Sequence, residues 1–233
     1  MRIAILSDIH SNLPALEQAF SVIEQINIDR IFCLGDIIGY GPFPNECIDL
    51  VREHCDGVVV GNHDFGLIER TPLSDFNKLG KKALQWTKKQ VNDQNLKFLN
   101  NLPLRIEENN ITFVHSSPAN PPDWTYITTI DDAKNAFGAF STQLCFFGHT
   151  HIPSVIGEDL SINQFRKDCR FLINVGSVGQ PRDGNPKPCI GILDTGVWSY
   201  ELIRFEYDVS KTAEAITRVG LPDMLAKRLI NGI

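Results

Sequence analysis

The chain has 233 residues, of which 42 % are hydrophobic, and its formal net charge is -6 at pH 7. This length fits one large domain or two small ones, and the apolar content is enough for a sizeable core. The acidic balance argues against a general binder of nucleic-acid polymers or of membrane surfaces, because such proteins need a basic face.

No stretch of the sequence is apolar over the roughly 20 residues that a membrane-spanning helix needs. The first residues, MRIAILSD, do not have the layout of a signal peptide. The six cysteines form no CxxC pair, and Cys33 and Cys145 lie inside apolar runs. We therefore expect free thiols and a cytoplasmic protein.

Short apolar runs rich in β-branched and aromatic residues recur along the chain and predict strands. They cover residues 2–8, 30–36, 57–64, 110–117, 144–151, 170–177 and 189–194. Most are continuous rather than alternating, which is typical of strands covered on both faces. The run at 198–208 alternates more, and we expect it nearer the edge of a sheet.

Helical patterns separate several of these runs. Residues Leu13, Leu16, Phe20 and Ile23 share one helical face, and the preceding Ser11 or Asn12 can cap this helix. Further helices are predicted over 45–54, 76–86 and 129–140, and two short ones over 210–233. Residues 102–115 predict two strands joined by a polar turn at 109–110. No linker divides the chain, so we expect a single α/β domain over 1–233 with helices on its outer faces.

Polar side chains follow the predicted strands with unusual regularity. Five of the six histidines, together with carboxylate and amide side chains, come directly after an apolar run. They are Asp8, His10, Asp36, Asn62, His63, Asp64, His115, His149 and His151. The carboxyl ends of parallel strands form the edge where ligands bind in α/β sheets. Independent core histidines have no reason to gather there, and His54 alone falls at a predicted helix end.

The spacing of these groups favours metal binding. In an extended segment, residues two apart point the same way, so Asp8 with His10 and His149 with His151 can each direct two donors to one place. Imidazole nitrogen and carboxylate oxygen are ligands for transition metals. One four-coordinate ion would leave several donors unused, whereas two ions bridged by a carboxylate would occupy them all. Such a pair suits displacement at phosphorus.

The motifs DIH, GDIIGYG, GNHD, VHSSP and GHTH stand in the order and spacing found in the calcineurin-like metallophosphoesterase superfamily. The chain most resembles its compact prokaryotic phosphodiesterase-type members. This resemblance implies a four-layer α-β-β-α sandwich, with two mixed sheets flanked by helices. It implies a phosphodiesterase or phosphatase in which a metal-bridging hydroxide attacks a small phosphoester, with nucleotides among the candidate substrates.

The resemblance also implies a role for each motif residue. One ion would be held by Asp8, His10 and His151, and the other by Asn62, His115 and His149, with Asp36 bridging them. His63, as an imidazolium, would protonate the leaving group, and Asp64 would orient it by a hydrogen bond. Asn62 would also bind the substrate and, with the metals, stabilise the negative charge that develops on it. Manganese, iron, zinc, nickel and cobalt all suit these ligands, and manganese is the first expectation.

Other features leave alternatives open. Arg182, in a glycine-rich segment after a strand, could bind the substrate phosphate or be an ordinary surface residue. Trp124 and Tyr126, in the loop 116–128 after His115, could stack on a nucleobase or merely fix the loop to the body. An inactive scaffold on the same fold is the main alternative function, and a metal-dependent hydrolase that acts on something other than phosphorus is another. The sequence indicates no oligomeric state.

Overall fold

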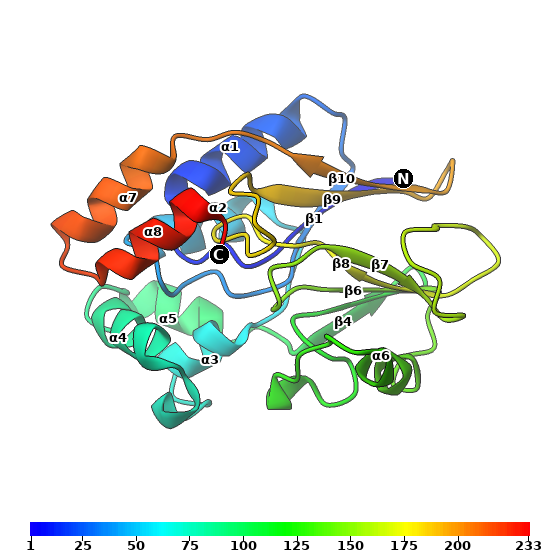
Figure 1. Cartoon of the computed structure of the whole chain (residues 1–233), viewed down its shortest axis with the longest axis horizontal. Helices are drawn as coiled ribbons and strands as arrows, with labels where there is room; N and C mark the ends of the chain where they lie inside the picture. Colours follow the sequence, from blue (N-terminus) through cyan, green and yellow to red (C-terminus); the bar gives the residue numbers. More distant parts are fainter.

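The computed structural model describes residues 1–233 as two packed sheets with helices outside them, as Figure 1 shows. The first sheet has the order β10-β9-β1-β2-β3. Its strands are β1 (Arg2–Leu6), β2 (Arg30–Cys33), β3 (Gly57–Val58), β9 (Cys189–Asp194) and β10 (Ser199–Arg204). Strands β1, β2 and β3 run parallel, and β9 and β10 are antiparallel additions. The alternating β10 is an edge strand, as predicted.

The second sheet has the order β4-β5-β6-β8-β7. Its strands are β4 (Arg105–Glu108), β5 (Ile111–Val114), β6 (Leu144–Phe147), β7 (Ser154–Gly157) and β8 (Phe171–Asn174). The three central strands are parallel and the two outer ones antiparallel. Strands β4 and β5 form the predicted hairpin, whose turn residues Asn109 and Asn110 have positive φ angles of 50° and 63°. Asparagine tolerates this left-handed conformation well.

Eight α-helices complete the fold. They are α1 (Leu13–Glu24), α2 (Pro44–His54), α3 (Asn62–Leu67), α4 (Lys78–Thr87), α5 (Asp93–Asn100), α6 (Ile130–Phe137), α7 (Val209–Arg218) and α8 (Asp223–Asn231). Helix α1 is capped by Asn12, and α6 begins with a capping box formed by Thr129 and Asp132. None of these helices has the length and apolar character that crossing a bilayer requires.

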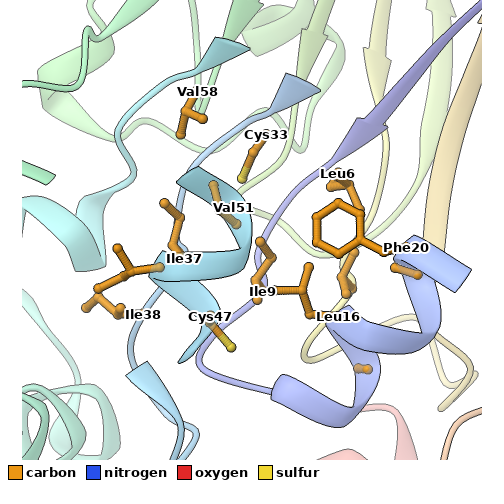
Figure 2. Packing of buried hydrophobic residues seen from close by; sticks show 14 of the residues in the cluster. Leu6, Ile9, Leu16, Phe20, Cys33, Ile37, Ile38, Cys47, Val51 and Val58 are labelled. Atoms are coloured by element: carbon orange, nitrogen blue, oxygen red, sulfur yellow. The ribbon is translucent and has the colours of Figure 1, made fainter. Parts of the chain in front are cut away.

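Three apolar layers join the elements. Between the sheets, the rings of Phe32 and Phe113 stack with centroids 4.1 Å apart. The outer face of the first sheet packs on α1 and α2, where Leu16, Phe20 and Val51 are buried (Figure 2). The outer face of the second sheet packs on α6. The predicted four-layer α-β-β-α sandwich is therefore confirmed, and Figure 1 shows α1 and α6 on opposite sides of it.

The remaining helices lie around the end of the sandwich. Helices α7 and α8 pack against α4 and the loop residue Tyr40 in a fourth apolar cluster that includes Ala83 and Leu225. The predicted tail therefore docks on the body. The six cysteines are free thiols, and five of them are buried.

Candidate metal centre

The metal-ligand candidates stand where five parallel strands end. Strand β1 ends two residues before Asp8, and β2 three residues before Asp36. Helix α3 begins at Asn62 after β3, while His115 directly follows β5, and His149 comes two residues after β6. Because β1–β3 and β5–β6 are parallel within their sheets, their carboxyl ends collect these side chains.

Three overlapping groups of donors converge there. Each group has its donor atoms within 4.8 Å of one another, and the groups are Asp8, His10 and His151; His10, Asp36 and His63; and Asp36, His115 and His149. All of these residues are buried. Asn62 joins them, with its Oδ1 3.2 Å from His115 Nε2. The structure thus brings together every residue that the sequence predicted as a metal ligand.

Backbone carbonyl groups fix the orientation of three imidazoles. A carbonyl oxygen can only accept, so Nδ1 is the donor in His10 to Ile38 (3.2 Å), in His115 to Leu34 (2.8 Å) and in His151 to Gln180 (2.5 Å). In the neutral tautomer that these bonds select, Nε2 presents its lone pair to the cluster. This is how proteins commonly orient metal-binding histidines.

The groups that face one another are acceptors, and they need a cation between them. His10 Nε2 lies 3.1 Å from His151 Nε2. Asp8 Oδ1 is buried without a hydrogen-bond partner, and His151 Nε2 lies 3.2 Å from it. Two carboxylates, Asp8 and Asp36, are buried among these nitrogens. A buried polar atom without a partner is costly, so this donor set fits divalent ions and is poorly satisfied without them.

The pKa values of the ion-free cluster agree with this view. Burial alone would lower the pKa of His115, but the nearby Asp36 and Asp8 outweigh it and raise the pKa to about 9. A positive charge is therefore stable at this position, and a bound metal would displace that proton. At His149, burial and the neighbouring His115 lower the pKa to about 3, which keeps its ring neutral and available as a ligand.

The local backbone differs from the extended segments that the sequence predicted. Asp8, His10, His149 and His151 have positive φ angles of 53°, 50°, 66° and 61°, and Asp36 has 49°. The left-handed region costs an L-residue roughly 1–2 kcal/mol. The donors still converge, but through tight left-handed turns that end each strand. Strain concentrated in this way is typical of functional sites.

The expected pairing of His63 with Asp64 is wrong. The Asp64 carboxylate accepts hydrogen bonds from the backbone N–H groups of Gly61 (3.0 Å), Ile38 (3.2 Å) and Ile37 (3.4 Å). His63 Nδ1 is buried with no hydrogen-bond partner. Asp64 therefore holds the loop after β2 against the start of α3 and does not orient the imidazole.

Burial sets the charge state of His63 in the free protein. It lowers the pKa of His63 to about 4, so the ring is neutral near pH 7 before a substrate binds. Its position agrees with a role beside the metal ligands, because its ring centroid lies 4.9 Å from that of His10.

Arg182 lies at the rim of the cluster. Its guanidinium donates to Gln180 Oε1 at 2.9 Å and lies 5.7 Å from the centre of the Tyr40 ring. Its charge helps to lower the pKa values of His63 and His151, after burial. The side-chain hydrogen bonds of Arg182 go to the neutral Gln180 and not to a carboxylate, so its charge remains available to an anionic ligand.

Several supporting residues were not predicted. Ser7 donates to Asp8 Oδ2 (2.7 Å), and Asn174 Nδ2 donates to the Gly148 carbonyl (2.6 Å), which holds the His149 loop. A Cβ atom at Gly148 would collide with the Ser7 hydroxyl and the Asp8 carboxylate. Glycine at this position therefore lets the backbone after β6 lie directly against these two side chains. Asn174 is the last residue of β8. The pattern of polar side chains at the carboxyl ends of predicted strands could therefore have identified it as well.

Aromatic rings enclose the same histidines. Tyr126 stacks on His149 with centroids 4.0 Å apart, and Phe76 meets His63 edge-on at 5.1 Å. Phe76 was predicted inside a helix, but α4 begins only at Lys78, because Asn77 caps it. Trp124 donates its indole N–H to Thr71 Oγ1 (2.9 Å), which fixes the loop after His115.

Comparison with known proteins identifies relatives over the whole chain. The profile of the calcineurin-like phosphoesterase superfamily domain matches residues 1–196. The uncharacterised protein MJ0912 from Methanocaldococcus jannaschii is 45 % identical over 242 residues, which cover 99 % of this chain and 98 % of the relative.

Two solved structures are similar over their full length. The metallophosphoesterase from Sphaerobacter thermophilus has 40 % identity and a TM-score of 0.89, covering 100 % of this chain and 99 % of its own. The hypothetical protein PH1004 from Pyrococcus horikoshii OT3 has 21 % identity and a TM-score of 0.84, covering 100 % and 98 %. The second likeness concerns the fold alone.

Proposed function

Because the chain belongs to the calcineurin-like phosphoesterase superfamily, we propose that it is a metal-dependent hydrolase of a phosphodiester or phosphomonoester bond. The observation that carries this proposal is the convergence of buried carboxylate, amide and imidazole groups from five strand ends on one place, where Asp8 Oδ1 and His149 Nε2 have no hydrogen-bond partner. A purely structural cluster would be expected to pair its carboxylates and imidazoles internally.

The residues divide into two ligand sets. Asp8, His10 and His151 would hold one ion, and Asn62, His115 and His149 the other. Asp36 would belong to both sets, since its Oδ2 lies 3.7 Å from His10 Nε2 and 3.4 Å from His115 Nε2. Two divalent ions bound there would supply a nucleophilic water and polarise the phosphoryl oxygens.

Arg182 and His63 would act on the substrate itself. The unpaired guanidinium of Arg182 is suited to bind a phosphoryl oxygen by a charge-assisted hydrogen bond. His63 would donate its ring proton to the leaving oxygen. A bound phosphate anion would raise the pKa of His63 above its low value in the free protein, because an opposite charge favours the imidazolium, and the imidazolium would give the proton.

The mixed nitrogen and oxygen ligands suit manganese, iron, zinc, nickel and cobalt, and manganese is the first of these ions to test. The experiment strips the purified protein of metal, adds back each divalent ion and measures hydrolysis of bis-p-nitrophenyl phosphate and p-nitrophenyl phosphate. We expect activity to depend on the added ion and to disappear in Asp36→Asn. Tight binding of ions without hydrolysis of any phosphoester would instead favour an inactive scaffold.

A further inference from the structure

A hollow of about 430 Å³ opens beside the metal-ligand candidates. Two of those candidates, Asn62 and His149, form part of its lining, and residues 70–72, 75–76, 122–124 and 126 form the rest. Hollows of about 300–1,000 Å³ hold small-molecule ligands in proteins. A substrate whose phosphate lies at the metal ligands would therefore extend its non-reacting part into this space.

Three aromatic side chains form walls of the hollow, and each rests on a histidine of the cluster. Tyr126 lies nearly parallel to His149, with 26° between the ring planes, and is 49 % exposed, so its other face is free. Phe76 stands edge-on to His63 at 71°. Trp124 stands edge-on to His115, with centroids 5.9 Å apart, and its indole is fixed by Thr71. Fixed rings of this kind favour a flat aromatic ligand.

The charged lining argues against a second phosphate. Asp75 and Asp123 contribute carboxylates, and Arg70 is the single cation. The Arg70 guanidinium is engaged by Asn100 Oδ1 (3.0 Å) and by the Phe65 ring (5.4 Å). The carboxylates accept only from the neighbouring Ser74 and Asn120, which leaves an oxygen of each free to accept from an amine. The lining thus suits a neutral ring that carries N–H donors.

We propose that this hollow recognises a nucleobase, and that the substrate is a nucleoside phosphoester with one phosphate rather than a sugar phosphate or a polyphosphate. The proposal rests on the proposed function for the position of the phosphate. Base stacking on Tyr126 supplies the affinity, and Asp75 accepts from the exocyclic amine of a base such as adenine. A sugar phosphate offers no ring to stack, and a polyphosphate would meet the two carboxylates.

A second hollow, of about 340 Å³, provides a matched comparison. It lies under Ile130, Ile152 and Ile162 and has no titratable side chain or metal-ligand candidate in its lining. Ile130 is 60 % exposed, so Ile130→Ala removes apolar surface without disturbing the core.

The first test compares two esters with the same leaving group in the Mn²⁺-loaded protein. They are adenosine 5′-(p-nitrophenyl phosphate) and methyl p-nitrophenyl phosphate. We expect kcat/KM for the adenosine ester to be about tenfold higher or more, which corresponds to the stacking of one base. Tyr126→Ala should lower this ratio to near one, Asp75→Asn should lower it partly, and Tyr126→Phe and Ile130→Ala should keep it. Equal rates for the two esters, or a ratio insensitive to Tyr126→Ala, would overturn the proposal.

The second test separates the pocket from the chemistry. Calorimetric titration of the full chain, without added metal, compares AMP with ribose 5-phosphate. We expect AMP to bind about tenfold tighter, and the difference to vanish in Tyr126→Ala. If the protein prefers AMP but hydrolyses neither ester, the hollow recognises a nucleobase and the proposed phosphoesterase activity is wrong. If it hydrolyses the esters but binds AMP and ribose 5-phosphate equally well, the activity stands and the proposed nucleobase recognition is wrong.

Discussion

The backbone N–H of His63 donates a 2.7 Å hydrogen bond to Asp36 Oδ1. This bond leaves Asp36 Oδ2 facing His10 and His115, which belong to different ligand sets. A single carboxylate is thereby fixed by helix α3 on one side and offered to two ions on the other. The position of the first turn of α3 is thus linked to the geometry of the metal centre.

Asp36→Asn should preserve the bond from His63 and place an amide nitrogen where an oxygen ligand is needed. Because an N–H₂ group cannot ligate a cation, we expect metal affinity at least about 100-fold weaker and activity lost. Metal content after dialysis, measured by mass spectrometry, checks this expectation. Asp131→Asn is the control, since Asp131 is 89 % exposed on α6. A full complement of metal in Asp36→Asn would contradict the bridging role.

His63→Gln should slow the substrates that most need a proton. A positioned general acid contributes about 10²–10⁴-fold, so we expect a loss of that size for alkyl phosphoesters. The p-nitrophenolate group leaves readily without a proton, and the loss for its esters should be much smaller. Comparing kcat for the two leaving groups checks this difference. Equal losses for both would indicate that His63 only supports the structure.

Arg182→Ala should weaken substrate binding more than it slows turnover. Loss of a charge-assisted hydrogen bond costs about 1.5–3 kcal/mol, so KM should rise about 10- to 100-fold. Arg182→Lys keeps the charge but loses the fork of donors, and it should restore only part of the affinity. Initial rates over a range of substrate concentrations measure both effects. An unchanged KM in Arg182→Ala would show that Arg182 is an ordinary surface residue that does not bind the substrate.

The stability of the ion-free protein should fall at high pH because of Tyr207. Burial raises the pKa of Tyr207 to about 12 from 10.0, although the hydrogen bond from Asn12 acts in the opposite direction. Burial favours the neutral phenol in the folded state. The contribution of Tyr207 to the free energy of unfolding is therefore complete below pH 10 and is lost as pH rises from 10 to 12. The loss amounts to up to about 2–3 kcal/mol.

Urea unfolding of wild type and Tyr207→Phe at pH 8 and pH 11 measures this contribution. The variant lacks the 3.1 Å bond from Asn12 and should be about 1 kcal/mol less stable at pH 8. It should lose less stability on going to pH 11. Tyr200, whose pKa burial also raises, is present in both proteins and cancels in the comparison. Equal losses in the two proteins would show that Tyr207 is not responsible.

The sequence predicted the sheets and the metal ligands because both depend on local patterns. Continuous apolar runs identified the central strands, and the polar residues after them had to gather where parallel strands end. Strand β7 was not identified, because its four residues are mostly half-buried and carry no long apolar run. Helix α5 was missed as well, since only two of its eight residues are buried.

Contacts between distant segments were beyond such patterns. Asp64 stands next to His63 in the chain, yet its carboxylate binds the amides of Ile37 and Ile38, which only the folded loop brings close. The stacking of Tyr126 on His149 depends likewise on the path of a whole loop. The tail is a third case, because the hydroxyl of Thr212 in α7 donates to Asn12 Oδ1 across 200 positions of sequence.

A crystal structure of the Mn²⁺-loaded protein, with anomalous data recorded at the manganese absorption edge, tests the central claim most directly. We predict two anomalous peaks about 3.5–4 Å apart, one beside Asp8, His10 and His151 and the other beside Asn62, His115 and His149, with Asp36 between them. Anomalous density that is absent from this cluster, or a single ion that leaves either set of ligands unoccupied at saturating Mn²⁺, would contradict the account.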